Sequence, residues 1–287
     1  MIFTFSILHY KTIDDTIECI DSIKNINQKC EIVVVNNDEN VDSFNKLKNK
    51  YKDNNIHFVD NNKNIGFAAA NNLGYKYAKD VLKSDFIAVI NNDTIIKSKS
   101  IIELFEEKYK RDNFAIAGPD ILGIDLKTHQ NPMSIVDYKK EELIKKSIEN
   151  KVAYYLCKIG FYKLFLNYSN KACKHGDKKE NDEQFNIQLQ GSFVVYSPKY
   201  IANEDFAFYP GTFLYMEEAI LYYYAKSMKY LTAYYPDIKI IHKGGSSTSS
   251  VYKNSKKVYE MRLKNISKSL LVLKEVMDKY PLENNND

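Results

Sequence analysis

Short apolar runs alternate with helix-like segments through residues 3–109, and this alternation restricts the chain to few folds. Buried strands are predicted at 3–8, 31–35, 56–59 and 86–90. Helices, where apolar residues recur at helical spacing, are predicted at 13–23, 41–51, 67–79 and 101–109. Strands that alternate with helices form a mostly parallel sheet covered on both faces. The sequence therefore predicts an α/β fold with a Rossmann-like sheet flanked by helices.

The composition excludes some classes of protein. The net charge of +4 is small for 287 residues, so we expect no nucleic-acid partner. Four cysteines, at 19, 30, 157 and 173, are scattered without a Cys-x-x-Cys pair. This spacing argues against a zinc site or a disulfide framework and is typical of a reducing compartment.

No segment has the length and apolarity of a membrane-spanning helix. The apolar start, MIFTFSILHYK, has too few residues to cross a bilayer, and it has neither a basic leader nor a cleavage site of small residues. We therefore expect a cytoplasmic protein, with any membrane contact peripheral.

Polar side chains follow each of the four predicted strands. These clusters are 9–10, 36–38, 60–64 and 91–93. Any one of them alone is typical of a turn, because Asn and Asp tolerate left-handed backbone and cap helices. In open parallel sheets, however, ligands bind beyond the carboxyl ends of the strands. Four clusters at one edge therefore predict a ligand site there.

After Gly118-Pro119 the regular alternation ends. The remaining pattern predicts a loop at 175–186, strands at 187–196, 230–235 and 238–241, and helices at 141–166, 217–228 and 255–280.

The helix at 141–166 has one apolar stripe with lysines elsewhere around it. The stripe consists of Ile148, Val152, Tyr155, Ile159, Tyr162 and Leu166. Three interpretations are open: the stripe packs on the protein body, lies at a membrane interface, or forms an oligomer contact. Packing is the default expectation, and the C-terminal helix has the same ambiguity.

VINNDT and six further segments, in order along the chain, resemble glycosyltransferase family 2, the inverting enzymes with a GT-A fold. VINNDT (89–94) is similar to the Asn-x-Asp-Thr metal motif of bacterial rhamnosyltransferase-like members. The other matching segments are ILHYKTIDDTIECIDSI, EIVVVNNDEN, NKNIGFAAANNLGYKYA, QGSFVVYSPKYI with FYPGTFLYMEEAIL, and YYPDIKIIHKGGSST. The resemblance covers most of the chain. It implies a nucleotide-sugar-binding half at 1–120, an acceptor-binding and catalytic half at 121–250 with a helical insertion at about 139–170, and a C-terminal amphipathic helix at 251–287.

Two positions depart from the family pattern. Asn36 stands where the family usually has the Asp that contacts a base, so Asp38 becomes an alternative contact. The usual Glu-Asp acid pair is Glu217-Glu218 here, so the second carboxylate has a side chain one methylene longer.

The resemblance implies a catalytic pair and a metal site. Glu218 would be the general base, and Glu217 would raise the pKa of Glu218 by like-charge repulsion and hold the acceptor. Without the resemblance, two acids at a helix start are more simply explained by the helix dipole. The metal, Mn²⁺ or Mg²⁺, would be bound by Asp93, Asn91 and His242. A lone strand-end His is otherwise more often structural.

A larger set of residues is expected to form the donor pocket. It comprises His9, Tyr10, Asn36, Asp38, Asn64, Gly66, Asn91, Asn92 and Gly191. Gly66 and the backbone N–H groups before the helix at 67–79 would allow close approach of the donor. Gly191 would admit the donor sugar, although a bulge at a strand start is equally consistent. The small residues 244–248 are expected to close over bound nucleotide.

The implied reaction is transfer of a sugar from a UDP- or dTDP-sugar to a hydroxyl of a glycan or lipid-linked acceptor, in bacterial capsule or lipopolysaccharide synthesis. Homo-oligomerisation stays open. The alternative is a catalytically silent nucleotide-sugar-binding or scaffold protein of the same fold. A sugar-nucleotide pyrophosphorylase and a Rossmann dehydrogenase are disfavoured, because no Gly-rich phosphate loop follows a predicted strand.

Overall fold

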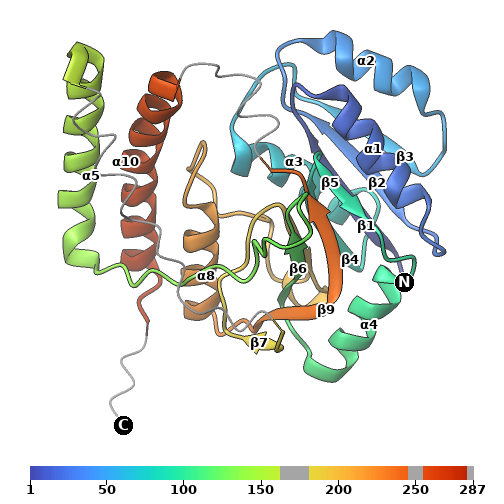
Figure 1. Ribbon diagram of the computed structural model, residues 1–287. Helices are drawn as coiled ribbons and strands as arrows, with labels where there is room; N and C mark the ends of the chain where they lie inside the picture. Colours follow the sequence, from blue (N-terminus) through green and yellow to red (C-terminus); the bar gives the residue numbers. More distant parts are fainter. Residues whose placement is uncertain (162–180, 245–254, 283–287) are drawn as a thin grey trace.

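The four predicted strands of the N-terminal half form the parallel part of one sheet in the computed structural model, which describes residues 1–161, 181–244 and 255–282 (Figure 1). In sheet order they are β3 (Ile56–Asp60), β2 (Glu31–Asn36), β1 (Phe3–His9) and β4 (Phe86–Asn91). The predicted helices are α1 (Ile13–Lys24), α2 (Val41–Lys50), α3 (Phe67–Asp80) and α4 (Ile101–Asp112). The expected α/β architecture is confirmed.

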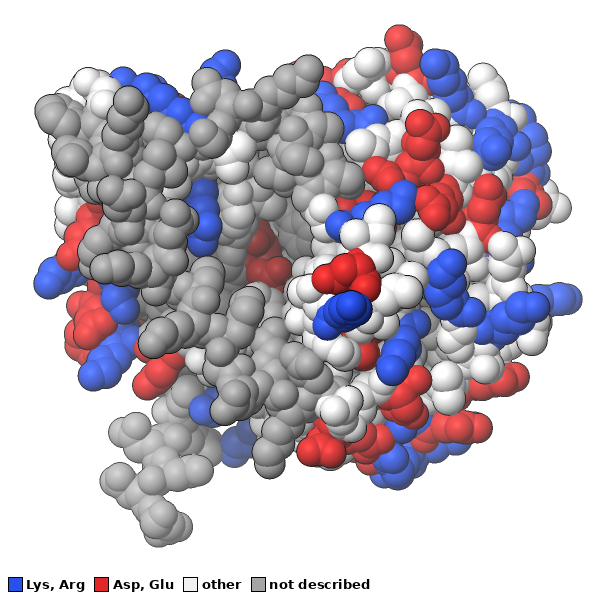
Figure 2. Space-filling view, in the orientation of Figure 1, with Lys and Arg blue, Asp and Glu red and all other residues white. Residues whose placement is uncertain are grey.

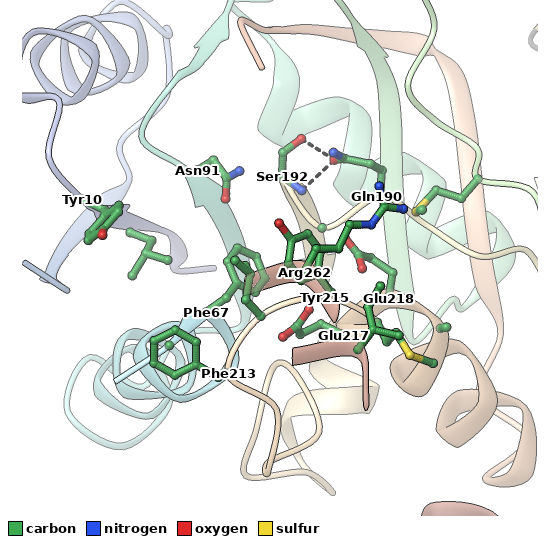
Figure 3. A pocket seen from close by; sticks show the side chains of 18 of the residues that line it. Tyr10, Phe67, Asn91, Gln190, Ser192, Phe213, Tyr215, Glu217, Glu218 and Arg262 are labelled. Carbon is green, nitrogen blue, oxygen red and sulfur yellow. Dashed lines mark hydrogen bonds between the residues drawn. The ribbon is translucent and has the colours of Figure 1, made fainter. Parts of the chain in front are cut away.

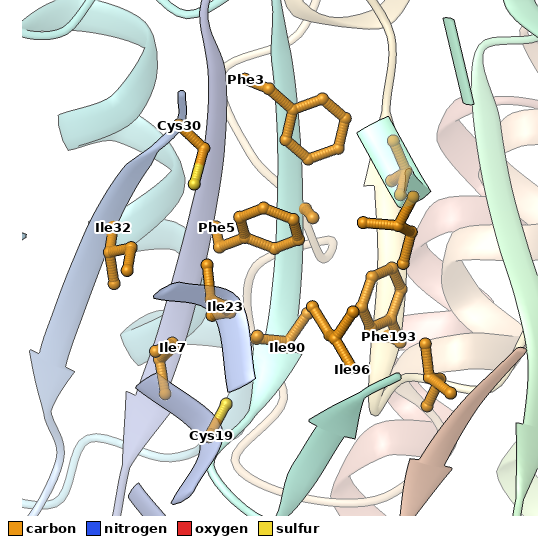
Figure 4. Close-up of a cluster of buried hydrophobic side chains, with 14 of the residues drawn as sticks. Phe3, Phe5, Ile7, Cys19, Ile23, Cys30, Ile32, Ile90, Ile96 and Phe193 are labelled. Carbon is orange, nitrogen blue, oxygen red and sulfur yellow. The ribbon is translucent and has the colours of Figure 1, made fainter. Parts of the chain in front are cut away.

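Both faces of this sheet are buried, which explains why its strands are nearly continuous apolar runs. Along β4, Phe86, Ala88 and Ile90 pack in one cluster, whereas Ile87 and Val89 pack in another on the opposite face. Figure 4 shows the first cluster, in which side chains of β1 meet those of α1 and β4. Cys19, Cys30 and Cys157 are buried free thiols, as expected for small apolar side chains, and Cys173 lies outside the described residues.

The second half of the chain continues the same sheet. Next to β4 lie β8 (Phe193–Tyr196), β6 (Ile116–Leu122), β9 (Thr232–His242) and the short β5 (Thr94–Ile96), in that order, and β7 (Gln184–Phe185) pairs with β9. The antiparallel β4–β8 and β5–β9 pairs bring segments of the second half of the chain next to the carboxyl end of β4. A four-residue helix, α7 (Pro198–Ile201), follows β8.

Prolines explain two errors of the sequence analysis. The strand β6 was not predicted because it contains Gly118-Pro119, and the single strand β9 was predicted as two strands flanking Pro236. Pro119 pairs with Tyr235 but Asp120 pairs with Lys239, so residues 236–238 bulge out of the ladder. A bulge is where a strand can accept proline without losing a ladder hydrogen bond. Of the predicted strand at 187–196, only 193–196 forms, and of the predicted loop at 175–186, residues 184–185 form β7 and 175–180 lie outside the described residues.

Three helices lie side by side at one side of the sheet (Figure 1). They are α8 (Glu217–Ser227), then α10 (Ser255–Lys279), then α5 (Lys140–Leu156), which continues into a wider turn η1 (Cys157–Phe161). Leu143 of α5, Leu273 of α10 and Ile220 of α8 share one apolar cluster. The α5–α10 contact also contains a buried hydrogen bond of 2.7 Å from Ser147 Oγ to the Ser267 carbonyl.

The apolar stripe of α5 does not pack on the protein body. Ile148, Val152, Tyr155 and Ile159 are 56%, 51%, 55% and 71% exposed, so the default expectation of packing is wrong for them. Tyr162 and Leu166 lie outside the described residues. None of the helices in the described part of the chain is long and apolar enough to cross a membrane.

Candidate active site

A cavity of about 670 Å³ opens at the carboxyl ends of the parallel strands. Figure 2 shows acidic side chains at the bottom of a hollow near the centre of this face. Ten of the thirteen predicted site residues line the cavity: Tyr10, Asn64, Gly66, Asn91, Asn92, Asp93, Gly191, Glu217, Glu218 and His242. The three that do not are His9, Asn36 and Asp38. In Figure 3, Asn91 and Ser192 lie across the cavity from Glu217 and Glu218.

The end of β4 supplies the polar floor of the cavity. Asn91 is the last residue of β4, and Asp93 is followed at once by β5, whose Thr94 pairs with His242 of β9. This pairing holds Asp93 Oδ1 3.2 Å from His242 Nε2, with both side chains buried. The Asn91 amide nitrogen lies 3.5 Å from the same Nε2. The three predicted metal ligands are therefore brought together, although 151 positions separate Asn91 from His242.

A glutamine that the sequence analysis did not single out fixes the His242 ring. This residue is Gln130. Its Oε1 lies 2.7 Å from His242 Nδ1, and its Nε2 donates to the His242 carbonyl at 3.1 Å. Because the glutamine oxygen can only accept, Nδ1 carries the proton, and the other ring nitrogen, Nε2, faces Asp93. Metal-bound histidines are commonly oriented by such a partner.

The donor set of this corner fits a divalent cation. A carboxylate, an imidazole nitrogen and an amide face one another, and these groups suit Mn²⁺ or Mg²⁺ when substrate oxygens complete the coordination. No group of three or more His, Cys, Asp or Glu side chains with metal-ligand spacing occurs in the described part of the chain. The corner thus provides few protein ligands of its own.

Asn92 has a different role from its neighbours. Its amide nitrogen donates to Thr12 O and Thr12 Oγ1, both at 3.2 Å, and to Thr16 Oγ1 at 3.0 Å. The amide nitrogen of Asn92 therefore holds the segment between β1 and α1 in place and is used inside the protein.

The acid pair begins α8 behind a strained turn. Tyr215 and Met216 both have left-handed backbone, with φ of 75° and 72°, immediately before Glu217. Two successive non-glycine residues in this region cost free energy, and such strain tends to occur at functional sites. Here the turn directs the first residues of α8 into the cavity.

Burial is the main influence on both carboxyl groups. It raises the pKa of Glu217 to about 7, with a further contribution from the charge of Glu218, and Glu217 Oε1 has no hydrogen-bond partner among the described residues. Burial also raises the pKa of Glu218, against an opposing effect of the Gly191 backbone N–H. A Cβ at Gly191 would lie 2.9 Å from Glu218 Oε1. The glycine therefore leaves room for the carboxylate, and its expected place beside the donor sugar stays a prediction.

His9 and Asn36 face away from the cavity, because they are in register on neighbouring strands and point to the same face of the sheet. His9 is fully buried, and its ring nitrogens lie 2.7 Å from Thr16 Oγ1 and 3.0 Å from Ser43 Oγ. Burial lowers the pKa of His9 to about 4 despite the charge of Asp38. The Asn36 amide donates to Asp60 Oδ1 at 3.0 Å.

Asp38 is bound to Lys11 at 2.9 Å. Burial favours its neutral form, but hydrogen bonds from Lys11 and the Asn40 backbone outweigh burial and lower the pKa of Asp38. The neighbours Tyr10 and Asn37 line the cavity instead. The alternation of side chains along a strand was the available signal for Asn37. Because His9 and Asn36 point away from the cavity, the residues that follow them, Tyr10 and Asn37, point toward it.

The backbone N–H groups before α3 are not available to a donor. Asn37 Oδ1 accepts from Ile65 N at 2.9 Å, Asn64 Oδ1 accepts from Gly66 N at 3.0 Å, and the Phe213 carbonyl accepts from Phe67 N at 2.7 Å. Gly66 has φ of 92°, and a Cβ there would lie 2.6 Å from the Phe213 carbonyl oxygen. The glycine is thus required by the loop that leads to the acid pair.

Several further residues of the cavity were not predicted. Arg262 extends from α10 into the space between the strand ends and the acid pair (Figure 3), and it is the only lysine or arginine among the described residues that line the cavity. Gln190 accepts from Ser192 N at 2.7 Å and so shapes the turn next to Gly191. Arg262 had one signal in the sequence, since it is one of only two arginines in a lysine-rich chain.

Comparison with known proteins agrees with this geometry. The family model described as Glycosyl transferase family 2 matches residues 6–168. The low-salt glycan biosynthesis hexosyltransferase Agl10 of Haloferax volcanii is 30% identical over 116 residues, which are 40% of this chain and 35% of Agl10. The chain thus matches about a third of the length of that curated relative.

Solved glycosyltransferases share the fold. S. aureus TarS 1-349 in complex with UDP-GlcNAc has a TM-score of 0.55 at 14% identity, over 93% of this chain and 66% of TarS. Mannosyltransferase PcManGT from Pyrobaculum calidifontis, in complex with GDP-Man and Mn²⁺, has a TM-score of 0.51 at 10% identity, over 97% of this chain and 73% of PcManGT. The central sheet flanked by helices is a GT-A fold, and the chain belongs to glycosyltransferase family 2.

Proposed function

We propose that this protein transfers a sugar from a nucleoside-diphosphate donor to an acceptor hydroxyl, by direct displacement with inversion. The observation that supports the proposal most strongly is that Asn91, Asp93 and His242 share one cavity with Glu217 and Glu218. Such a reaction needs a group that takes the proton of the hydroxyl and a positive charge near the leaving diphosphate. Both kinds of group are available across this cavity.

Glu218 is the proposed general base. It lies at the cavity wall, and burial raises its pKa above the usual range of a glutamate, which makes the carboxylate a stronger base. Glu217, whose pKa is raised to about 7 by burial and by the charge of Glu218, is the proposed partner that holds the acceptor. Gly191 leaves room for the Glu218 carboxylate to reach the acceptor.

Asp93, His242 and Asn91 would hold Mn²⁺ or Mg²⁺, which when bound would neutralise the charge of the diphosphate. Gln130 keeps His242 in the tautomer whose Nε2 is free to ligate. Arg262 would add a second positive charge near the donor phosphates. Tyr10, Asn37 and Asn64 would border the nucleoside.

The donor we favour is a UDP- or dTDP-linked hexose, in line with the hexosyltransferase relative, and the acceptor a glycan or lipid-linked saccharide of bacterial capsule or lipopolysaccharide. The solved neighbours bind UDP-GlcNAc and GDP-Man, which supports a sugar nucleotide as donor. A cytoplasmic location, peripheral membrane association and a homo-oligomer belong to the same proposal.

Donor hydrolysis tests the proposal. We expect Mn²⁺- or Mg²⁺-dependent release of nucleoside diphosphate from one member of a sugar-nucleotide panel, and a loss of about 100-fold or more in Glu218→Gln, because the amide cannot accept the proton. Glu107→Gln, the same change at an exposed position of α4, should leave the rate unchanged.

Thermal shift on the same panel separates the enzyme from a silent binding protein. The true donor should raise the melting temperature by mass action, and more so with Mn²⁺. Stabilisation without hydrolysis in either metal would favour the catalytically silent binder. If no sugar nucleotide shifts melting, the assignment of the donor site is wrong.

A further inference from the structure

The outermost helix, α5, presents an exposed apolar stripe that packs on no other helix or strand of the described residues. Ile144, Ile148, Val152 and Tyr155 of α5, with Ile159 of η1, recur every three or four residues and are 48%, 56%, 51%, 55% and 71% exposed. The opposite face of α5 packs on α10 through Leu143 and Ser147. In Figure 1, α10 lies between α5 and α8, so the stripe faces away from the protein body.

Lysines flank this stripe on both sides. On a helical projection Lys151 and Lys158 border one side and Lys145 the other, and all three are exposed. The ion pair between Lys145 and Glu149 is long, at 4.0 Å, and therefore weak. Lys158 lies over the Tyr154 ring, 5.1 Å from its centroid. Glu141 is the one acid in line with the stripe, at its N-terminal end. Apolar side chains between lysines complement the acyl and headgroup layers of an anionic bilayer.

The stripe is connected to the cavity through the segment that precedes α5. Met133, Ser134, Val136 and Tyr138 line the cavity, and Ile135 and Val136 of the same segment are 46% and 53% exposed. The cavity wall and α5 are therefore joined directly along the chain.

We propose that the α5 stripe (Ile144, Ile148, Val152, Tyr155 and Ile159) docks this protein on a membrane rich in anionic lipid. The helix lies in the interface with its stripe among the upper acyl chains and its lysines at the phosphates. Docking brings the cavity next to a lipid-linked acceptor, and the proposal rests on the proposed function for this choice of acceptor.

Vesicle co-sedimentation of the full chain tests the surface. We expect binding to vesicles of phosphatidylcholine mixed with phosphatidylglycerol, weaker binding to phosphatidylcholine alone, and a decrease with added salt. The double variant Ile148→Glu/Val152→Glu should lower partitioning at least about tenfold. The matched control, Ile124→Glu/Leu126→Glu, alters two equally exposed apolar residues outside the stripe (72% and 58%) and should bind like the parent.

Three results would overturn the proposal: no binding to either vesicle, equal loss in both double variants, or light scattering that shows a dimer broken only by the α5 variant, which would assign the stripe to a second copy. Thermal melting of both variants should match the parent, because all four side chains are exposed. Donor hydrolysis measured without vesicles separates the two proposals. If the parent protein hydrolyses no donor, the proposed enzymatic function is wrong, whereas vesicle binding still decides the membrane proposal.

Discussion

At the scale of single residues, the cavity contains groups whose ionisation is unfavourable in the folded state. Glu217 is 3% exposed and its Oε1 has no hydrogen-bond partner among the described residues, so its charged form loses water that hydrogen bonds replace only in part. A protein accepts such a cost where a carboxyl group must change protonation near neutral pH. The sequence identified the pair Glu217-Glu218. Whether Glu217 is neutral or charged depends on its burial, which only the fold creates.

This gives a prediction for stability against pH. The pKa of Glu217 is raised from 4.5 to about 7 in the folded state, so its stabilising contribution is complete below pH 4.5 and is lost as the pH rises through 7. We expect the free energy of unfolding from urea titrations to fall by up to about 3 kcal/mol from this group between pH 5 and pH 8.

Glu217→Gln should remove that part of the pH dependence, because the amide resembles the protonated acid, and Glu107→Gln on α4 should retain it. Parallel pH profiles for the parent and Glu217→Gln would show that Glu217 has an ordinary pKa.

At the scale of elements, two glycines with left-handed backbone differ in what surrounds them. Gly66 caps α3 with φ of 92° and touches the Phe213 backbone, whereas Gly160 in η1 has φ of 109° and nothing within 4 Å of a built Cβ. The Gly66 contact joins the start of α3 to the loop that carries the strained turn before α8. Local sequence indicates a helix start at residue 66 but not the loop that packs on it.

Substitution by alanine should separate the cost of backbone strain from the cost of a steric clash. Gly160→Ala introduces only backbone strain, so we expect a loss of about 1 kcal/mol. Gly66→Ala adds a backbone clash at 2.6 Å, so we expect a loss of 3 kcal/mol or more, at roughly the upper end for point mutations. Urea unfolding of both variants measures the difference. Equal losses would mean that the Phe213 loop can move aside.

At the scale of the whole molecule, α10 completes a cavity whose floor is built from the first hundred residues. Met261, Arg262 and Ile266 reach it from the C-terminal helix, although α10 was expected only as an amphipathic helix with an undefined partner. Arg262 makes no ion pair with another described residue, and its exposed side chain lines the cavity.

We expect Arg262→Ala to lower kcat/KM for the donor at least about tenfold, because a charge-assisted contact to phosphate is lost. Thermal melting should be unchanged, since the side chain is exposed. Lys264→Ala, an exposed basic residue of the same helix outside the cavity, serves as the control. Equal activity of the two variants would exclude a role of Arg262 in donor binding.

The sequence by itself determined the parallel sheet, its helices and the edge at which polar residues gather. Periodicity and strand ends are local properties, so 3–8, 31–35, 56–59 and 86–90 were enough to place them. The acid pair and the Asp93 motif were likewise found, because each is a short contiguous segment. Prolines misled at β6 and β9, since a bulge depends on the partner strand.

Only the tertiary structure decided which of two adjacent residues faces the cavity, as with Asn37 rather than Asn36. It also decided that Gln130 orients His242, that Arg262 enters from α10, and that the apolar stripe of α5 stays exposed. Each of these depends on register and packing between segments far apart in the chain. No local pattern contains that information, because the same stripe or the same glutamine would look identical whichever neighbour the fold supplied.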